Sequence, residues 1–558
     1  MKLNALIITA VICLITATPV IAKTDLDETA AREAIRNALE PWKDASAGPG
    51  AIIQVSRAGQ PLIVGMTGYA DVEHTTAISE KTRFHVASLS KQFTAYAIVR
   101  LASEGKINLD ASLTAYLSEA SVYRDVTVRD LLAHTHGIRG ALSLIGASGF
   151  RPEDMVTNDH ALYLILRQRA MNAPPGDAFS YSNSGFILLA EIIERITGKS
   201  LAVYCREIIF QPLGMDDTLF VDSLKTIIPR RAQSYRRTSE GYGRAVLNYA
   251  LTGSTGLTTT GRDLALWAAH LDRLVEDDPD FYATFHTLGV LKDGSHTHYA
   301  YGQERREYRG LETWSHGGRD AGYRAFLLRA PSERLSISVL SNAADFDIAQ
   351  TTFDVLDALL GDKLTPKKTD ATTPSAQQLA AYAGDYELFP GLIFSLKALK
   401  ETLGFGLLGS ESFSELTFVS NHEFVLNPVT DLTIVFDPNV GQAAESFDYR
   451  IGMLGVLPAT RIELEPFEPA SVNYKNFEGS YYSAELSAAY DLVVRDQQLF
   501  AHHPAVGHIA LSPYQNDVFN SSNNYFQKLE FHRDTTGRVT GFHLSGALMV
   551  NVMFQRVR

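Results

Sequence analysis

The hydrophobic pattern divides the chain into a mixed α/β part and a later all-β part. Two β-rich runs between residues 49 and 71 flank Ala58-Gly59-Gln60, which predicts a hairpin. Apolar side chains then recur at helical spacing at 88–101, 127–135, 185–198 and 261–274. Strands return at 323–330 and 334–342. Strands at both ends of a helical middle predict one α/β (α+β) domain, with a central antiparallel sheet that distant segments close and helices flank.

The composition changes at residues 365–378, TPKKTDATTPSAQQ, which predicts a linker. Short alternating strands follow, and YAGDY at 382–386 matches FEGSY at 477–481, a shift of 95 residues. A constant offset over separated positions predicts a tandem repeat. We therefore expect a first domain at 23–364 and two small antiparallel β-barrel domains at 379–468 and 469–558. The same shift gives four further pairs: Leu416 with Leu511, Asn421 with Asn516, Phe424 with Phe519, and Phe436 with Phe531.

The N-terminus predicts export. Lys2, an apolar stretch from Ala5 and the small-residue site before Lys23 are typical of a signal peptide, here 1–22, cleaved after Ala22. The alternative is a retained membrane anchor, because the stretch nears the lower limit for spanning. No later segment offers an apolar run of that length, so we expect a periplasmic or secreted protein without an integral membrane domain. Cys205 would then be the only cysteine, and its helical apolar surroundings predict a small buried core residue.

The net charge and the absence of certain motifs argue against several classes of partner. The formal net charge of −13 argues against a phosphate-binding surface, and no Lys/Arg run is interleaved with aromatics, so nucleic acid is not an expected partner. The absence of H-E-x-x-H argues against a metallohydrolase. The absence of G-x-S-x-G argues against the nucleophile elbow of an α/β-hydrolase. We expect neither a metal nor a cofactor. The histidine pairs that lack two-metal spacing are His134-Thr135-His136, His296-Thr297-His298 and His502-His503.

The stretch FHVASLSKQF at 84–93 holds a candidate nucleophile. If Ser88 begins a helix, Lys91 lies one turn later on the same face, within reach of the hydroxyl. A serine attacks a carbonyl only when a base takes its proton, and a deprotonated lysine can do so. The alternative is an N-cap serine beside a solvated lysine. Ser103 and Lys106 repeat the spacing at a helix end closed by Gly105, so the pattern alone does not decide.

Two later motifs join it. Tyr181-Ser182-Asn183 lies in a Gly/Ser-rich turn just before a helix, where a phenol can relay protons; the alternative is a packed aromatic with an Asn cap. His316-Gly317-Gly318 precedes a predicted strand, and its glycines permit close approach of the backbone to a ligand; the alternative is an ordinary turn.

The order of these three motifs resembles the serine β-lactamase and penicillin-binding protein family. The closest resemblance is to its branch of class C β-lactamases, D-aminopeptidases and esterases, in which the middle motif is Tyr-x-Asn. It covers roughly residues 45–345 and includes VTVRDLLAHTHGI at 126–138, PLGMDDT at 212–218 and GSTGLTTTGRDLALW at 253–267.

The resemblance implies a role for each matched residue. Ser88 matches the acylated nucleophile, Lys91 its partner, Tyr181 the proton-transferring phenol and Asn183 the residue that binds the substrate amide. The backbone N–H groups of Ser88 and Arg319 match the oxyanion hole. Which of Lys91 and Tyr181 is the base stays open.

One departure from the family pattern bears on the substrate. His316 stands where many members have a lysine, and histidine is mostly neutral near pH 7. Together with Gly317 and Gly318, it is expected to bind an ester or a small peptide, with D-amino-acid substrates included. The alternatives are a β-lactamase or penicillin-binding carboxypeptidase, and a non-catalytic protein that traps an acyl group.

The tandem β domains resemble the lipocalin-like barrels appended to some D-amino-acid peptidases of this group. There such a barrel can reach over the active site and restrict substrate size. The alternative is a stabilising or oligomerising appendage, so a homo-oligomer is also considered.

Overall fold

The computed structural model describes residues 26–43, 48–151, 153–366, 374–408, 410, 412–420, 422–426, 432–436, 443–451 and 455–557. The predicted signal peptide lies outside these residues, and so do residues 367–373 of the predicted linker. Helix α12 (Ala376–Tyr382) begins inside the last part of that predicted segment.

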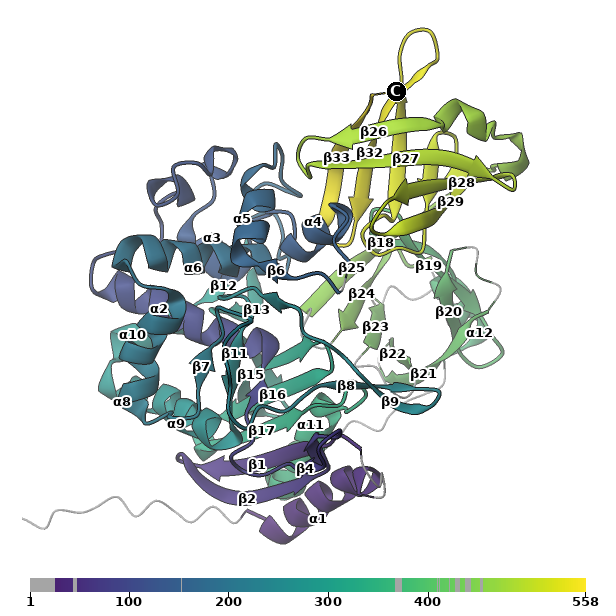
Figure 1. The fold of residues 1–558 in the computed structure, drawn as a ribbon. Coiled ribbons are helices and arrows are strands. Elements are labelled where there is room, and N and C mark those ends of the chain that lie inside the picture. Colours follow the sequence, from purple (N-terminus) through teal and green to yellow (C-terminus); the bar gives the residue numbers. More distant parts are fainter. Residues whose placement is uncertain are drawn as a thin grey trace, which may run out of the picture.

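The first domain is built on an eight-stranded antiparallel sheet, as predicted (Figure 1). β1 (Ala51–Arg57) and β2 (Gln60–Thr67) form the predicted hairpin, and Ala58 and Gly59 between them adopt positive φ. β1 also pairs with β17 (Leu335–Ser341) along its whole length, with Ala51 opposite Ser341. Distant segments therefore close the sheet. Its order is β12 (Leu288–Val290), β13 (His296–Ala300), β14 (Gln303–Tyr308), β15 (Leu311–Asp320), β16 (Tyr323–Ala330), β17 (Leu335–Ser341), β1 (Ala51–Arg57) and β2 (Gln60–Thr67).

Helices cover both faces of this sheet. Alternate residues of β1, Ala51, Ile53 and Val55, pack under α1 (Glu28–Leu39) and α11 (Ile348–Leu360), while Ile52 faces the other layer. That layer holds α2 (Ser90–Ser103), α3 (Val128–Ala133), α6 (Asn183–Thr197) and α9 (Gly261–Asp277). Because both faces are covered, the central strands are buried along their length: every residue of β17 is buried, and so is every residue of β1 except Arg57. Cys205 lies in the same core as a fully buried free thiol, as predicted.

The all-β part forms two closed antiparallel barrels of eight strands, which confirms the prediction of tandem barrels. The strands of the first barrel are β18 (Gly384–Phe389), β19 (Leu392–Ala398), β20 (Leu403–Leu407), β21 (Ser414–Ser420), β22 (Glu423–Leu426), β23 (Leu432–Phe436), β24 (Ser446–Ile451) and β25 (Gly455–Ile462). Those of the second are β26 (Gly479–Ser483), β27 (Ala488–Arg495), β28 (Gln498–His503), β29 (Gly507–Gln515), β30 (Val518–Asn520), β31 (Lys528–Arg533), β32 (Val539–Gly546) and β33 (Met549–Arg556).

The repeat has the same chemistry in each copy. Tyr386 Oη donates to the carbonyl of Tyr382 at 2.9 Å, and Tyr481 Oη donates to the carbonyl of Phe477 at 2.8 Å. An arginine from the last strand lies over each tyrosine ring: Arg461 at 4.9 Å from its centroid in the first barrel, and Arg556 at 5.9 Å in the second. The shift of 95 residues therefore extends to the arginines.

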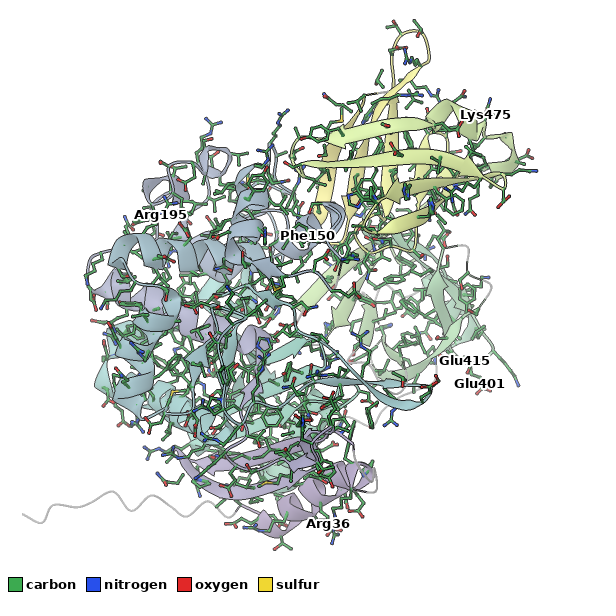
Figure 2. All side chains as sticks on the ribbon, in the orientation of Figure 1. Arg36, Phe150, Arg195, Glu401, Glu415 and Lys475 are labelled. Atoms are coloured by element: carbon green, nitrogen blue, oxygen red, sulfur yellow. The ribbon has the colours of Figure 1, made fainter. Side chains whose placement is uncertain are left out.

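The second barrel docks on the helical layer beside α4 (Ala141–Ala147) and α5 (Asn158–Leu166) (Figure 1). Its buried apolar residues and those of the helices form one continuous core, whereas the first barrel has a separate core. Figure 2 places Phe150 where the helices meet this barrel. Its neighbour Gly149 leaves no room for a Cβ, because the His503 ring would lie 2.2 Å away.

A buried ion pair crosses this interface. Arg139 Nη1 donates to Glu485 Oε2 at 2.7 Å, and the two side chains are 1% and 6% exposed. The backbone N–H of Arg169 donates to the same carboxylate oxygen at 2.8 Å. The Ala547–Leu548 turn adds main-chain contacts, since Gly140 N donates to Leu548 O at 2.7 Å. The second barrel is therefore joined to the segment that follows α3.

Candidate functional site

Ser88 lies in a tight turn at the start of α2. A 3₁₀ turn, Ala87–Leu89, comes first, and the α-helix begins at Ser90, two residues later than the sequence pattern predicted. Ala87 adopts a φ of 47°, a left-handed conformation that is costly for a residue with a side chain. Ser90 is buried and donates to the carbonyl of Ala87 at 2.6 Å. The turn thereby holds Ser88, which is half-buried, at the helix start.

Lys91 is fully buried and has three contacts. Its Nζ lies 3.2 Å from Ser88 Oγ, and it donates to Asn183 Oδ1 and to the main-chain carbonyl of Ser254, each at 2.8 Å. Burial lowers the pKa of Lys91 well below its usual value, and the charge of Asp320 opposes that shift in part. The amine therefore loses its proton far more readily than a surface lysine does.

Tyr181 and Asn183 reach the same point from the turn before α6. Ser182 is the N-cap of this helix and Asn183 its first residue. The Tyr181 ring centroid lies 4.8 Å from Lys91 Nζ. Burial raises the pKa of the Tyr181 phenol, which the nearby Ser88 hydroxyl lowers in part. Among the described residues, the phenol oxygen has no hydrogen bond of ordinary geometry.

His316-Gly317-Gly318 precedes β16, the strand predicted at 323–330, but it also lies inside a strand of its own, β15, which the sequence did not predict. The pairing of β14 with β15 ends at Ser315, while β16 pairs with β15 as far as Asp320. Beyond Ser315 one edge of β15 is thus open towards the Ser88 turn. A Cβ on Gly318 would lie 2.1 Å from the carbonyl oxygen of Val86, so only glycine permits this approach.

His316 is a neutral residue at this edge. It is 1% exposed; its Nδ1 donates to the carbonyl of Gly317 at 2.6 Å, and its Nε2 accepts from Tyr299 Oη at 3.1 Å. Burial, with the charge of Lys91, lowers the pKa of His316 to about 3. At neutral pH it therefore supplies no cation.

The end of β15 carries the other matched position. Arg319 follows Gly318, and its side chain is exposed. Asp320 comes next and is buried: it accepts from His85 Nε2 at 2.8 Å, from Thr255 Oγ1 at 3.2 Å and from the Tyr249 hydroxyl. This network fixes the strand beside the Ser88 turn.

Sequence reasoning missed three contributors to the site. Ser254 acts through a main-chain carbonyl, which has no sequence signal. Asp320 immediately follows the recognised motif but matches no motif position. His134 lies in the stretch VTVRDLLAHTHGI at 126–138, for which the resemblance implied no site residue, yet its ring centroid lies 4.3 Å from that of Tyr181.

Groups suited to a metal lie elsewhere. Within the described ranges, the one cluster of three such side chains is Asp71, Glu73 and His74, on the surface. No helix in the described part of the chain is long and apolar enough to cross a membrane.

Comparison with known proteins points to one family. The Beta-lactamase family model matches residues 33–359, more than half of the chain. D-aminopeptidases of Brucella ovis and Brucella anthropi are 26% identical to this chain over 531 and 540 residues, which cover 91% and 92% of it and 96% of each relative.

Two solved structures share the fold. The octameric penicillin-binding protein homologue from Pyrococcus abyssi is 21% identical, covers 78% of this chain and 99% of its own, and has a TM-score of 0.53. The D-amino acid amidase from Ochrobactrum anthropi SV3, complexed with L-phenylalanine amide, is 19% identical, covers 60% of this chain and 99% of its own, and has a TM-score of 0.51.

Proposed function

Because the chain belongs to the beta-lactamase family and is a serine hydrolase, we propose that it cleaves small peptides, amides or esters of D-amino acids through an acyl-enzyme on Ser88. The observation that carries this proposal is the position of Lys91, fully buried between Ser88 Oγ and Asn183 Oδ1. A lysine buried there is not stabilised as an ammonium by water, so its pKa is low. The amine is therefore unprotonated more readily and is available to take a proton.

The hydrogen bonds of Lys91 favour this residue as the base. A neutral amine has two N–H groups, and two acceptors are in place at 2.8 Å: Asn183 Oδ1 and the Ser254 carbonyl. The nitrogen lone pair is then left for the third contact, the Ser88 hydroxyl at 3.2 Å. Ser88 would pass its proton to Lys91 as its Oγ attacks the carbonyl carbon.

Tyr181 is then suited to be the acid. Burial raises the pKa of its phenol while burial lowers the pKa of Lys91, so both groups are neutral at the same pH. Two groups whose pKa values are pushed apart in this way can act as an acid and a base. The phenol would protonate the leaving nitrogen or oxygen and recover its proton from Lys91. Water, deprotonated by the same pair, would release the acid product and restore Ser88.

The oxyanion of the tetrahedral intermediate would be held by the backbone N–H groups of Ser88 and Arg319. The approach of Gly318 to Val86 brings β15 against the Ser88 turn, which supports this assignment. Asn183 and the open edge at His316, Gly317 and Gly318 would bind the substrate amide.

The neutral state of His316 favours a substrate without a carboxylate at this position. A β-lactam presents a carboxylate, and a histidine whose pKa is lowered to about 3 does not offset its charge. The curated relatives named D-aminopeptidase, 26% identical over most of the chain, support D-amino-acid substrates.

The decisive experiment is covalent labelling with a fluorophosphonate, read by intact mass, alongside turnover of D-aminoacyl amides, p-nitrophenyl esters and nitrocefin. Ser88→Ala is expected to lose the label and roughly 10³-fold or more of kcat/KM. Ser103→Ala is the matched control, because Ser103 and Lys106 have the same spacing but Ser103 is the last residue of α2 and Lys106 lies beyond it; this variant is expected to match wild type. Equal labelling of wild type and Ser88→Ala would refute the proposal. Labelling without turnover would indicate an acyl-trapping protein.

We also propose export with cleavage after Ala22, a role for the second barrel in bounding the substrate site, and a homo-oligomer. The predicted signal peptide supports the first, and the contacts of the barrel with the segment after α3 support the second. The name of the octameric homologue supports the third only through a shared fold. N-terminal sequencing of the secreted protein tests export, and Lys23 is the first residue expected. Light scattering tests the oligomeric state.

A further inference from the structure

We propose that His134 is a positioning residue that holds the Tyr181 phenol beside Lys91. This inference rests on the proposed function, because it assigns His134 to the proton transfer in which Tyr181 takes part. His134 does not touch Ser88 in the contacts described above, so it would act through Tyr181.

His134 is hydrogen-bonded to both chain neighbours of Tyr181. Its carbonyl accepts from the backbone N–H of Ser180 at 2.8 Å, and its Nδ1 accepts from the backbone N–H of Ser182 at 3.2 Å. Helix α3 ends at this residue, which adopts a left-handed φ of 57°. The conformation that ends the helix thus lets one residue bind the Tyr181 turn with both its main chain and its ring.

The ring of His134 also packs directly on the phenol. The His134 and Tyr181 centroids lie 4.3 Å apart, and Tyr299 and Phe186 contact the same imidazole at 4.8 and 5.2 Å. The His134 side chain is fully buried. Tyr181 is therefore held by its backbone neighbours and by a ring contact from one residue.

The hydrogen bonds require a neutral imidazole. Because Nδ1 accepts the Ser182 N–H, the ring proton must lie on Nε2, and among the described residues that nitrogen has no hydrogen-bond partner. Burial and the charge of Lys91 lower the pKa of His134 well below its usual value, in agreement with that state.

His136 supplies a matched control. It is also fully buried, and its Nε2 also has no partner in the part of the chain that is described, but its Nδ1 accepts from Ile138 N at 2.9 Å within its own turn. Its ring centroid lies 6.3 Å from that of His134. Replacing His136 should therefore disturb the same segment without releasing Tyr181.

The test is a double-mutant cycle in kcat and KM on a D-aminoacyl amide. His134→Ala is expected to lower kcat roughly 10²-fold with KM changed less than about threefold, because orientation is lost while substrate binding remains. His134→Asn is expected to recover most of kcat, since asparagine tolerates the left-handed conformation and its Oδ1 can accept the Ser182 N–H. His136→Asn is expected to keep kcat within about threefold of wild type.

The decisive arm uses the Tyr181→Phe background. There His134→Ala should cost less than about threefold in kcat, because the group it positions is already gone. A loss of the same factor in both backgrounds would overturn the inference, and so would an unchanged kcat in His134→Ala. Where the alanine variant does not fold, the cycle with His134→Asn decides: any loss of kcat in that variant must disappear in the Tyr181→Phe background.

Unfolding of the same four proteins separates a positioning role from a packing role. Coupling between His134 and Tyr181 in the free energy of unfolding, without coupling in kcat, would mean that the contact only stabilises the fold. Failure of the proposed function looks different, because Ser88→Ala would then retain turnover whatever His134 does.

Discussion

At the scale of single residues, burial decides the chemistry of Lys91. A lysine on the surface is an ammonium at neutral pH, whereas Lys91 has no access to solvent and its pKa is well below the usual value. Lys106, at the same spacing from Ser103, instead pairs with Glu104 at 2.8 Å, and its side chain is 56% exposed. The same Ser-x-x-Lys spacing therefore gives a buried amine at one site and an exposed, ion-paired amine at the other, and the difference comes from the surrounding fold.

The pH dependence of kcat/KM should report this buried amine. Activity is expected to fall as pH drops through the pKa of Lys91, because the base is then protonated. Asp320 raises that pKa, so Asp320→Asn should move the acid limb to lower pH. Glu304→Gln is the control, since the charge of Glu304 acts on Tyr181 and is not among the causes of the Lys91 shift. An acid limb that moves to higher pH in Asp320→Asn would contradict this account.

At the scale of elements, the site depends on one strand being longer than its neighbour. Five residues of β15, from His316 to Asp320, extend past the end of β14, and within the described part of the chain their strand pairing is with β16 alone. Their other edge meets the Ser88 turn, where Gly318 lies against Val86 and Ala87. The oxyanion pocket of the proposed mechanism therefore requires the strand edge and the turn to be in contact.

Gly318→Ala tests that contact. The added Cβ would lie 2.1 Å from the Val86 carbonyl oxygen and must push β15 away from the turn. We expect kcat/KM to fall roughly 10²-fold, as for the loss of an oxyanion donor, and the melting temperature to fall as well. Gly361→Ala is the control: its φ is −41° and no atom lies within 4 Å of the new Cβ, so it should match wild type. Full activity in Gly318→Ala would show that the strand edge is not part of the site.

Most elements could be predicted because their periodicity is local. Amphipathic helices and alternating strands bury one face, so their apolar side chains recur at a fixed spacing that the sequence displays. The repeat at a shift of 95 residues predicted the two barrels. The strand that contains His316-Gly317-Gly318 was not predicted, because paired glycines usually mark a turn, and the end of β14 leaves no signal in β15 itself. The order of the motifs predicted one site from Ser88, Lys91, Tyr181 and Asn183. In the structure Lys91 is hydrogen-bonded to Asn183 and lies 3.2 Å from Ser88 Oγ and 4.8 Å from the centroid of the Tyr181 ring. Ser254 and His134 were missed, because a main-chain carbonyl and a ring-on-ring contact arise only from tertiary structure.

At the scale of the whole molecule, the two barrels relate differently to the first domain. The second shares a hydrophobic core with the helical layer, while the first has a core of its own. Arg139 joins the two sides: its side chain binds Glu485, and its carbonyl accepts from Ser184 Oγ at 2.6 Å, next to Asn183. The second barrel is therefore part of the scaffold of the candidate site.

Glu485→Gln tests this connection. The change leaves the Arg139 charge buried without its carboxylate, and the free energy of unfolding is expected to fall by about 3–5 kcal/mol. Asp517→Asn is the control, because its ion pair with Arg533 lies in the same barrel with side chains that are 32% and 30% exposed; it should cost no more than about 1 kcal/mol. Chemical denaturation measures both. Equal losses would mean that the interface pair adds nothing beyond a surface ion pair.

Arg139 and Glu485 are 346 residues apart in the chain, so their ion pair can form only after most of the chain has been synthesised. During translation Arg139 leaves the ribosome long before the carboxylate that neutralises it has been made. Until then Arg139 lacks the carboxylate that neutralises it, and in the first domain its Nη1 has the neutral acceptor Gln168 Oε1, at 2.7 Å in the structure. We therefore expect a chain that ends before Glu485 to have a less stable segment after α3, and hence a less stable candidate site, than the full chain.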